Sequence, residues 1–371
     1  LRRQGGQGEV TGAAAQVREL RQIVQHTLVR EYPECLVTAG GGIAGGESKS
    51  NIEGDDGDDF ASSDQILAML RQASHRFAAL MADWIRVGYC QGNFNSDNCL
   101  VGGRTMDYGP FGFMEKFEPL WNMWVGGGEH YGFMNQTIAG EKNFASLVGA
   151  VICVLDSDED RGKATAILRE HRSASETAMT RMWARKLGLV GGEEKIVNEL
   201  AAHLLHLMGQ SEADWTMTWR QLAAVVEVHA ASGGSGGGGD SDGKLLEPLR
   251  DCFYSEDQEK NPITGQTMGA TWSQWIQQWL GEVERVSGHQ PANETAALMR
   301  QASPKYVPRE WMLVTAYENA QRGDYDMLRN LHDLFQDPYA EGRAEQEAAY
   351  FRKAPKETYM GVGKAGTAYM S

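Results

Sequence analysis

A glycine pair inside one short stretch constrains this chain more than any other feature. Residues 91–113 read QGNFNSDNCLVGGRTMDYGPFGF. Within them, Gly102 and Gly103 separate two short runs, residues 99–101 and 104–106. A two-residue glycine connection between such runs is a strong signal for a tight turn. The sequence therefore predicts a small β-hairpin with its turn at the two glycines.

This hairpin would bring two oxygen-bearing side chains together. Its register places Asn98 opposite Asp107, and opposed residues of an antiparallel pair have Cβ atoms about 5 Å apart. An amide oxygen and a carboxylate oxygen at that separation can bind one small cation. Mg²⁺ prefers oxygen ligands and leaves positions open for substrate phosphates. Asp97 precedes the asparagine and is expected to point to the other side of the turn.

The order of these residues is similar to that in protein kinases. The triplet at 107–109, Asp-Tyr-Gly, is a variant of the kinase Asp-Phe-Gly element, and Asn98 corresponds to the asparagine that closes the kinase catalytic loop. In the kinase pattern His-Arg-Asp-x-x-x-x-Asn the aspartate is the base. Its position here holds Asn93, which cannot accept a proton at neutral pH. An ordinary kinase mechanism is therefore in doubt.

The full pattern resembles the selenoprotein O family, which consists of kinase-like protein adenylyltransferases. The resemblance rests on Asn-Ser-Asp-Asn at 95–98, on the step to Asp107, and on the Tyr-Gly-Pro-Phe-Gly-Phe that follows. It implies that Asp97 is the proton acceptor and that Asn98 and Asp107 bind Mg²⁺, with Asp107 also serving the bound ATP. Gln91 stands where the family usually has histidine, which indicates a divergent branch.

The activity that this resemblance implies is transfer of AMP from ATP to Ser, Thr or Tyr hydroxyls of proteins, with Mg²⁺ and ATP as cofactors. One alternative is a protein phosphotransferase, because it would use the same metal ligands. Another is a non-catalytic pseudokinase or redox-interaction protein. In the family the tail continues past the position of Ser371 with cysteine or selenocysteine, so we expect a selenocysteine codon there. Eukaryotic relatives are mitochondrial, and we expect the same location.

Hydrophobic periodicity predicts a mainly α-helical chain. Apolar residues recur at helical spacing over residues 16–32. Ser62 and Gln65 form a predicted capping box for a helix that runs to about Val87. Residues 145–231 are also predicted to be mostly helical. A further apolar helix face is predicted from Trp272, Trp275, Ile276, Trp279 and Leu280.

The predicted organisation is a protein-kinase-like C-lobe followed by a helical C-terminal extension. Residues 1–14 are expected to be disordered, 15–150 to form the C-lobe with its catalytic hairpin, and 151–371 the helical region. Segments rich in Gly, Ser and Asp predict insertions at 38–61 and 232–243. No lysine occurs before Lys49, so we expect the N-terminal lobe of a kinase to be absent and ATP binding by this chain alone to be weak.

Composition limits the expected partners. A net charge of −15 argues against nucleic acid or an anionic membrane, and no apolar run approaches the roughly 20 residues that span a bilayer. The five cysteines lack metal-binding spacing and are odd in number, which favours a reducing compartment. We therefore expect ATP and hydroxyl-bearing protein substrates as partners, with neither nucleic acid nor membrane.

Overall fold

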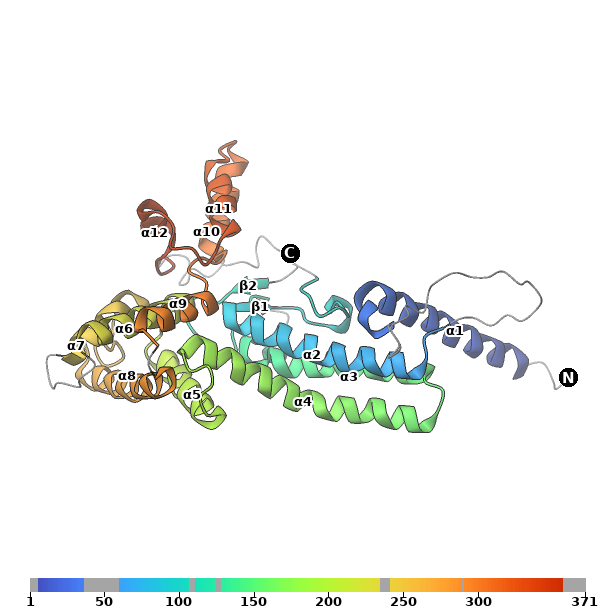
Figure 1. Cartoon of the computed structure of the whole chain (residues 1–371). Coiled ribbons are helices and arrows are strands. Elements are labelled where there is room, and N and C mark those ends of the chain that lie inside the picture. The colour runs from blue at the N-terminus through green and yellow to red at the C-terminus, as the bar shows by residue number, and fades with distance from the viewer. Residues whose placement is uncertain are drawn as a thin grey trace. The chain divides into compact units, whose positions relative to one another are not determined.

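The computed structural model is mostly helical and contains one small sheet (Figure 1). It describes residues 6–36, 60–106, 111–124, 128–233, 241–288 and 290–355, without the side chains of 6–14, 241 and 242. The helices are α1 (Gly6–Glu31), α2 (Ser63–Val87), α3 (Gln136–Val151), α4 (Asp158–Leu187), α5 (Glu194–Gln210), α6 (Trp215–Ala231), α7 (Ser241–Leu246), α8 (Gln266–Ser287), α9 (Ala292–Ala302), α10 (Glu310–Gln321), α11 (Asp326–Gln336) and α12 (Ala344–Tyr350). The mainly helical fold class is confirmed, while its kinase-like character stays a prediction.

The sheet consists of two antiparallel strands, β1 (Tyr89–Gln91) and β2 (Phe111–Phe113). Tyr89 pairs with Phe113 and Gln91 with Phe111. The two strands lie on either side of the loop of residues 92–110 in sequence. An antiparallel pair is therefore present, but the glycine pair lies inside the long loop and not at a tight turn between the strands.

The predicted tight hairpin at the glycine pair is therefore wrong. Residues 99–106 contain no strand, and Gly103 N donates to Leu100 O (2.9 Å) in a turn. Two-residue hairpin turns need a positive φ at their first central residue. Gly103 has a φ of 70°, whereas Gly102 does not lie in that region. The two glycines consequently cannot form the turn that their sequence suggests.

Helix α1 begins earlier than the sequence indicates. Its backbone is helical from Gly6, so the expected disorder of residues 1–14 is wrong for residues 6–14. Adding a residue to an existing helix gains one hydrogen bond without a new nucleus, and Ala13 and Ala14 are the best helix formers. The helix ends before Pro33, as predicted.

Contacts divide the chain into two compact units that interleave in sequence. Unit 1 comprises Leu1–Leu80, Asn95–Asp107 and Thr137–Glu176, and unit 2 comprises Met81–Phe94, Tyr108–Gln136 and Thr177–Ser371. Helices α2 and α4 each contribute residues to both units, and residue 150 lies within α3. The predicted domain division at residue 150 stays a prediction. The predicted insertion at 38–61 falls almost wholly outside the described residues, and 241–243 of the other insertion lie in α7.

The core of unit 1 packs α1, α2 and α3 together with the first turns of α4. Phe77 of α2 and Phe144 of α3 are buried with ring centroids 6.0 Å apart. The predicted capping box is confirmed, since Ser62 N donates to Gln65 Oε1 (2.9 Å) and Gln65 N donates to Ser62 Oγ (3.3 Å). Helix α2 ends at Val87, as its periodicity predicts.

One segment of the described chain is long and apolar enough to cross a membrane. It is Phe133–Val154, with a mean hydropathy of 1.3 and 33% of its window buried. The sequence-based claim that no such run exists is therefore corrected. Core helices of soluble proteins also reach this length and hydropathy. Phe144, Val148 and Val151 of this segment lie in the core of unit 1, and the absence of a membrane partner stays a prediction.

The core of unit 2 is built around tryptophans. All five residues of the predicted apolar face of α8 are buried. Trp275 and Trp279 stack with centroids 5.3 Å apart. Their indole nitrogens donate to carbonyls of neighbouring helices, Trp275 Nε1 to Leu200 O (3.1 Å) and Trp279 Nε1 to Leu187 O (2.8 Å). Trp275 and Trp279 thus combine apolar burial with a satisfied polar group.

Replacing Trp279 tests this core. Trp279→Ala removes a fully buried indole and leaves Leu187 O without its donor, so we expect the free energy of unfolding to fall by about 3–5 kcal/mol. Leu298→Ala, at a side chain that is 47% exposed, should change it by less than about 0.5 kcal/mol. Urea denaturation of both variants measures the change in the free energy of unfolding. Equal decreases in the two variants would contradict the placement of Trp279 in the core.

Candidate functional site

Asp97 and Asn98 lie on a single 3₁₀ turn, Ser96–Asn98, in the loop between the two strands. Asn98 N donates to Asn95 O (3.0 Å), which closes the turn. The side chain of Asp97 is exposed, and that of Asn98 is half-buried. Cys99, the next residue, packs against the core of unit 1. The turn is thus fixed at its end while the Asp97 carboxyl stays open to solvent.

Asp107 lies outside the described residues, as do Tyr108, Gly109 and Pro110. The hairpin register from which its position opposite Asn98 was derived is wrong. The pairing of Asn98 with Asp107 therefore rests on the family resemblance and stays a prediction.

The glycine turn is held by the C-terminal end of α1. Tyr32 Oη donates to Val101 O (2.6 Å), and Arg104 Nη2 donates to Glu31 Oε2 (2.7 Å). The Glu31 side chain is only 6% exposed. Burial raises the pKa of the Tyr32 hydroxyl, so this hydroxyl remains a donor at physiological pH. These bonds give the irregular loop the polar partners that a strand would otherwise supply.

Arg76 of α2 completes this support. Its Nη1 donates to Glu31 O (2.7 Å) and its Nη2 to Glu34 Oε1 (2.8 Å). Its guanidinium also lies 4.3 Å from the centroid of the Tyr32 ring, a cation–π distance. Glu31, Tyr32 and Arg76 therefore form a support for the loop that sequence reasoning missed.

This support lies close to the backbone of both glycines, and Gly103 is the position that requires glycine. A Cβ on Gly103 would lie 2.5 Å from Arg76 Cβ and 3.1 Å from the Arg76 main-chain carbon, whereas a Cβ on Gly102 would meet only the end of the Glu31 side chain. Glycine allows such backbone approach as well as tight turns. In the sequence, the glycine pair was the one sign that other residues approach the backbone closely at this position.

Gln136 fastens strand β1 within unit 2. Its Oε1 accepts from Gln91 N (2.9 Å), and its Nε2 donates to Tyr89 O (2.9 Å) and Phe133 O (3.1 Å). Gln136 is fully buried. Gln91, which replaces the family's usual histidine, is 1% exposed and accepts a hydrogen bond from Tyr89 Oη. Gln91 therefore holds the strand rather than facing solvent.

Cys99 follows Asn98 in the candidate loop. Burial raises the pKa of its thiol to about 12, so almost none of it is the reactive thiolate at neutral pH. Cys99 therefore acts as a small apolar residue beside the candidate site.

The donor chemistry of the predicted site suits a hard cation. Amide and carboxylate oxygens, which Asn98 and Asp107 would contribute, are the ligands that Mg²⁺ prefers. In the part of the chain that the structure describes, no group of three or more His, Cys, Asp or Glu side chains could hold a metal ion. The oxygen donors fit Mg²⁺ in type, and their geometry depends on Asp107.

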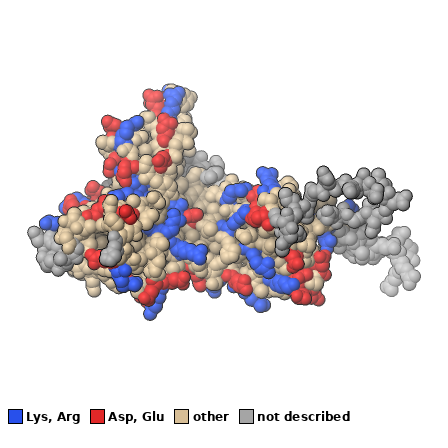
Figure 2. Space-filling view, viewed as in Figure 1, with Lys and Arg blue, Asp and Glu red and all other residues tan. Residues whose placement is uncertain are grey.

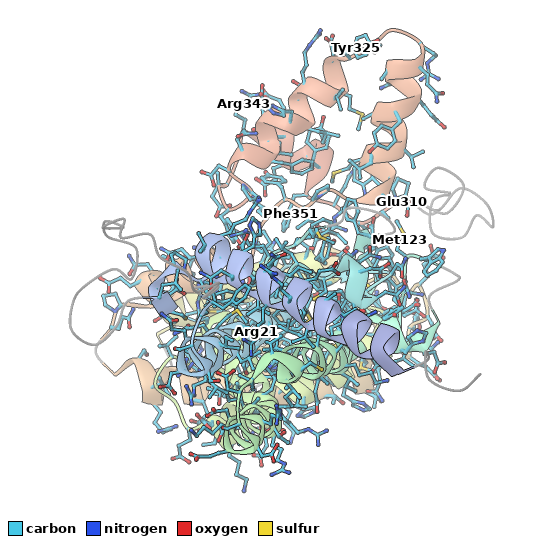
Figure 3. All side chains as sticks on the ribbon, turned by 90° about the vertical axis from the view of Figure 1, so that its right-hand side faces the viewer. Arg21, Met123, Glu310, Tyr325, Arg343 and Phe351 are labelled. Atoms are coloured by element: carbon cyan, nitrogen blue, oxygen red, sulfur yellow. The ribbon has the colours of Figure 1, made fainter. Side chains whose placement is uncertain are left out.

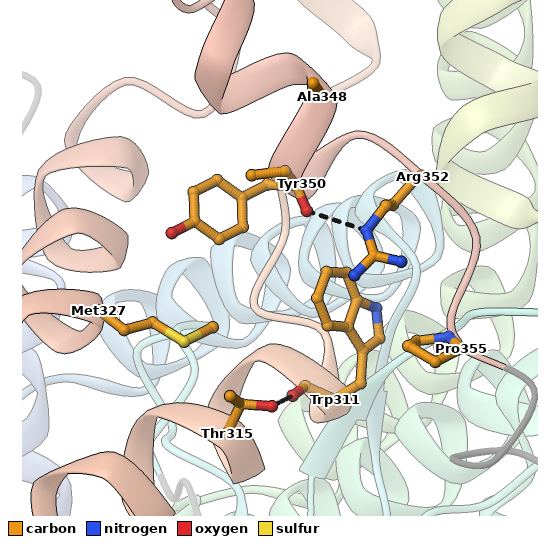
Figure 4. Close-up of a pocket in the computed structure, with 8 residues that line it drawn as sticks. Trp311, Thr315, Met327, Ala348, Tyr350, Arg352 and Pro355 are labelled. Atoms are coloured by element: carbon orange, nitrogen blue, oxygen red, sulfur yellow. Dashed lines mark hydrogen bonds between the residues drawn. The ribbon is translucent and has the colours of Figure 1, made fainter.

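A separate cavity of about 650 Å³ lies among α10, α11, α12 and the residues that follow α12 (Figure 4). Arg352 covers the Trp311 ring at 4.5 Å from its centroid and donates from Nε to Ala349 O (3.1 Å). Thr315 Oγ1 donates to Trp311 O (2.7 Å). The cavity contains none of the predicted site residues.

The surface seen in Figure 2 carries basic and acidic side chains interspersed. Single-sign patches are the usual footprint of nucleic-acid binding. The charge pattern of this face gives no reason to revise the expected partners, which stay a prediction.

Comparisons with known proteins agree with the sequence pattern. A family model described as "Protein adenylyltransferase SelO" matches residues 6–336. A protein from Flavobacterium johnsoniae named "Protein nucleotidyltransferase YdiU" is 27% identical over 361 residues, which is 96% of this chain and 60% of that protein. Proteins of the same name from Rhizobium meliloti and Pseudarthrobacter chlorophenolicus are 30% and 27% identical over 74% and 92% of this chain. The chain spans 50–60% of the length of these relatives.

Gly103→Ala tests the close approach of the loop to α2. The added Cβ would meet Arg76 and adopt a strained φ, so we expect unfolding to become easier by about 1–3 kcal/mol more than in a matched control. Gly191→Ala is that control, because Gly191 has a φ of 87° but no described atom lies within 4 Å of the position that its Cβ would take. Urea denaturation compares the two variants. Equal destabilisation would show that the contact with Arg76 does not constrain Gly103.

Proposed function

Because the chain belongs to the SelO family of protein adenylyltransferases, we propose that it carries the catalytic loop of an enzyme that transfers AMP from ATP to protein hydroxyls. The observation that carries this proposal is the family match over residues 6–336, which includes all three candidate residues. The activity of the whole protein, its substrates and its partners are part of the proposal.

In this reaction the oxygen of a Ser, Thr or Tyr hydroxyl forms a bond to the α-phosphorus of ATP. The bond from that phosphorus to the bridging oxygen breaks, and pyrophosphate leaves. Asp97 accepts the proton of the attacking hydroxyl. Its exposed position supports this role, because a protein substrate must reach the carboxylate.

Mg²⁺ and ATP are the proposed cofactors, and Asn98 and Asp107 are the proposed metal ligands. The bound ion would neutralise charge on the phosphates, which is the main requirement of such transfers. The bonds from Tyr32 to Val101 and from Arg104 to Glu31 hold the loop that carries Asn98, which supports the proposal of a loop arranged before substrate binds.

Finer features of the proposal rest on the family resemblance alone. They are a mitochondrial location, the identity of the metal as Mg²⁺, and hydroxyl side chains as acceptors. The phosphotransferase alternative uses the same loop, and the mass of the product separates the two.

Intact-mass analysis of an acceptor protein incubated with Mg·ATP tests the proposal. We expect one AMP moiety per modified site with the protein produced from its complete open reading frame. Asp97→Ala and Asp107→Ala should each lower the rate at least about 100-fold, because each removes a group that acts on the reacting atoms.

Asp64→Asn is the control, since Asp64 is an exposed carboxyl at the start of α2. It should leave the rate unchanged. A product heavier by phosphate would favour the phosphotransferase. Full activity of both alanine variants would exclude these residues from catalysis.

A further inference from the structure

A buried charge cluster lies where the chain leaves β2. Arg309 donates from Nη1 to Asp214 Oδ2 (2.6 Å) and from Nη2 to Asp214 Oδ1 (2.8 Å). The same Nη1 also donates to Glu115 Oε2 (3.0 Å). The side chains of Arg309 and Asp214 are 2% and 0% exposed, and that of Glu115 is 18% exposed. One guanidinium therefore serves two carboxyl groups away from water.

Asp214 accepts more hydrogen bonds than Glu115 does. Besides two bonds from Arg309, it caps α6 by accepting from Met217 N (2.9 Å), and Tyr254 Oη donates to it (3.1 Å). Glu115 has one bond from Arg309 and a long contact of 3.5 Å with Tyr254 Oη. Burial raises the pKa of Tyr254, so its hydroxyl stays a donor. The cost of burying a charge is therefore offset less by hydrogen bonds at Glu115 than at Asp214.

Among the residues that the structure describes, the two lysines near the cluster are engaged elsewhere. Lys116 pairs with Glu118 and Glu212. Lys353 donates to Phe253 O and lies 5.9 Å from the Tyr254 ring centroid. Glu310, labelled in Figure 3 at the start of α10, adds a further half-buried carboxyl.

The backbone around Glu115 is joined to the start of α6. Trp215 N donates to Glu115 O (2.8 Å), and Phe117 N donates to Ala213 O (2.8 Å). Met114 N also donates to Gly88 O (2.7 Å). The segment that follows the Asp-Tyr-Gly triplet and β2 is thus attached to α6 beside the charge cluster.

We propose that Glu115 is a positioning residue for the segment of residues 111–117, and that this segment is held firmly when the Glu115 carboxyl is protonated and loosened when it ionises. A proton on Glu115 leaves Arg309 to Asp214 and removes the repulsion between the two carboxylates. An effect of Glu115 on AMP transfer rests on the proposed function, and it is expected because Asp107 precedes this segment. The attachment of the segment to α6 does not depend on the proposed function.

The electrostatics of the cluster support this assignment. Burial, the largest cause, and the nearby Asp214 raise the pKa of Glu115 to about 7 against the pull of Arg309. Burial, with a smaller contribution from Glu115, raises the pKa of Glu310 to about 7. A carboxyl whose pKa is raised on folding binds its proton more tightly in the folded state. Its contribution to stability is therefore full below an ordinary pKa near 4.5 and is lost as pH rises through about 7.

Carboxyl ¹³C NMR of the wild-type chain tests the proton directly. We expect the Glu115 signal to titrate with a midpoint near 7, as its pKa predicts. A midpoint at or below about 5, the ordinary range of glutamate, would overturn the proposal. Resonances are assigned with Glu115→Gln and Glu310→Gln, so that the two carboxyls are distinguished.

Amide hydrogen exchange tests the attachment. Between about pH 6 and about pH 8, corrected for intrinsic rates, we expect the Trp215 and Phe117 amides to lose about tenfold protection, the factor for one pKa unit. Glu115→Gln should reduce that loss, because its side chain stays neutral and of these two carboxyls only Glu310 still titrates in this range. Glu118→Gln, at an exposed carboxyl one residue beyond this segment, should retain it. Protection that does not depend on pH in the wild type would contradict the role of Glu115.

The same variants separate this inference from the proposed function. If the enzyme transfers AMP, its rate should fall over this pH range more steeply in the wild type than in Glu115→Gln. If no AMP is transferred but the titration and exchange results hold, the positioning role of Glu115 stands and the proposed function is wrong. If Glu115 titrates in the ordinary range of glutamate and AMP is transferred, the positioning role alone is wrong.

Discussion

The central constraint in this structure is that an irregular loop must find hydrogen-bond partners outside itself. The loop between β1 and β2 carries the candidate residues, and the strands at its ends have three residues each. Strands this short are unstable alone. Helices supply what the sheet cannot: the Tyr32 hydroxyl of the α1 end bonds the loop at Val101, and the Gln136 side chain bonds β1. Preorganisation of the site thus comes from helical side chains.

This arrangement agrees with the family to which the chain belongs. Phosphoryl and nucleotidyl transfers need positioning and charge neutralisation more than covalent chemistry from the protein. A loop that is held at several points and carries the exposed Asp97 carboxylate meets the first need. The charge cluster at Arg309 differs from this loop, because its carboxyl groups are kept away from water and share a single guanidinium.

Local signals predicted local structure well. The Ser62–Gln65 capping box, the end of α2 and the tryptophan face of α8 all follow from spacing and burial. The glycine pair misled because the same two residues serve a hairpin turn or a close contact, and the choice depends on Glu31 and Arg76, which lie far away in sequence. For the same reason the pairing of Asp214 with Arg309 could not be read from the chain, since neither has a neighbouring partner.

The buried amide of Gln136 also limits how this protein can diverge. One end of it accepts from β1 and the other donates to β1. A carboxylate at this position could only accept, an ammonium group could only donate, and an aliphatic side chain could do neither. Because these partners are main-chain atoms, which every residue presents except for the missing N–H of a proline at 91, substitutions in β1 cannot compensate for loss of the amide, and position 136 tolerates few replacements.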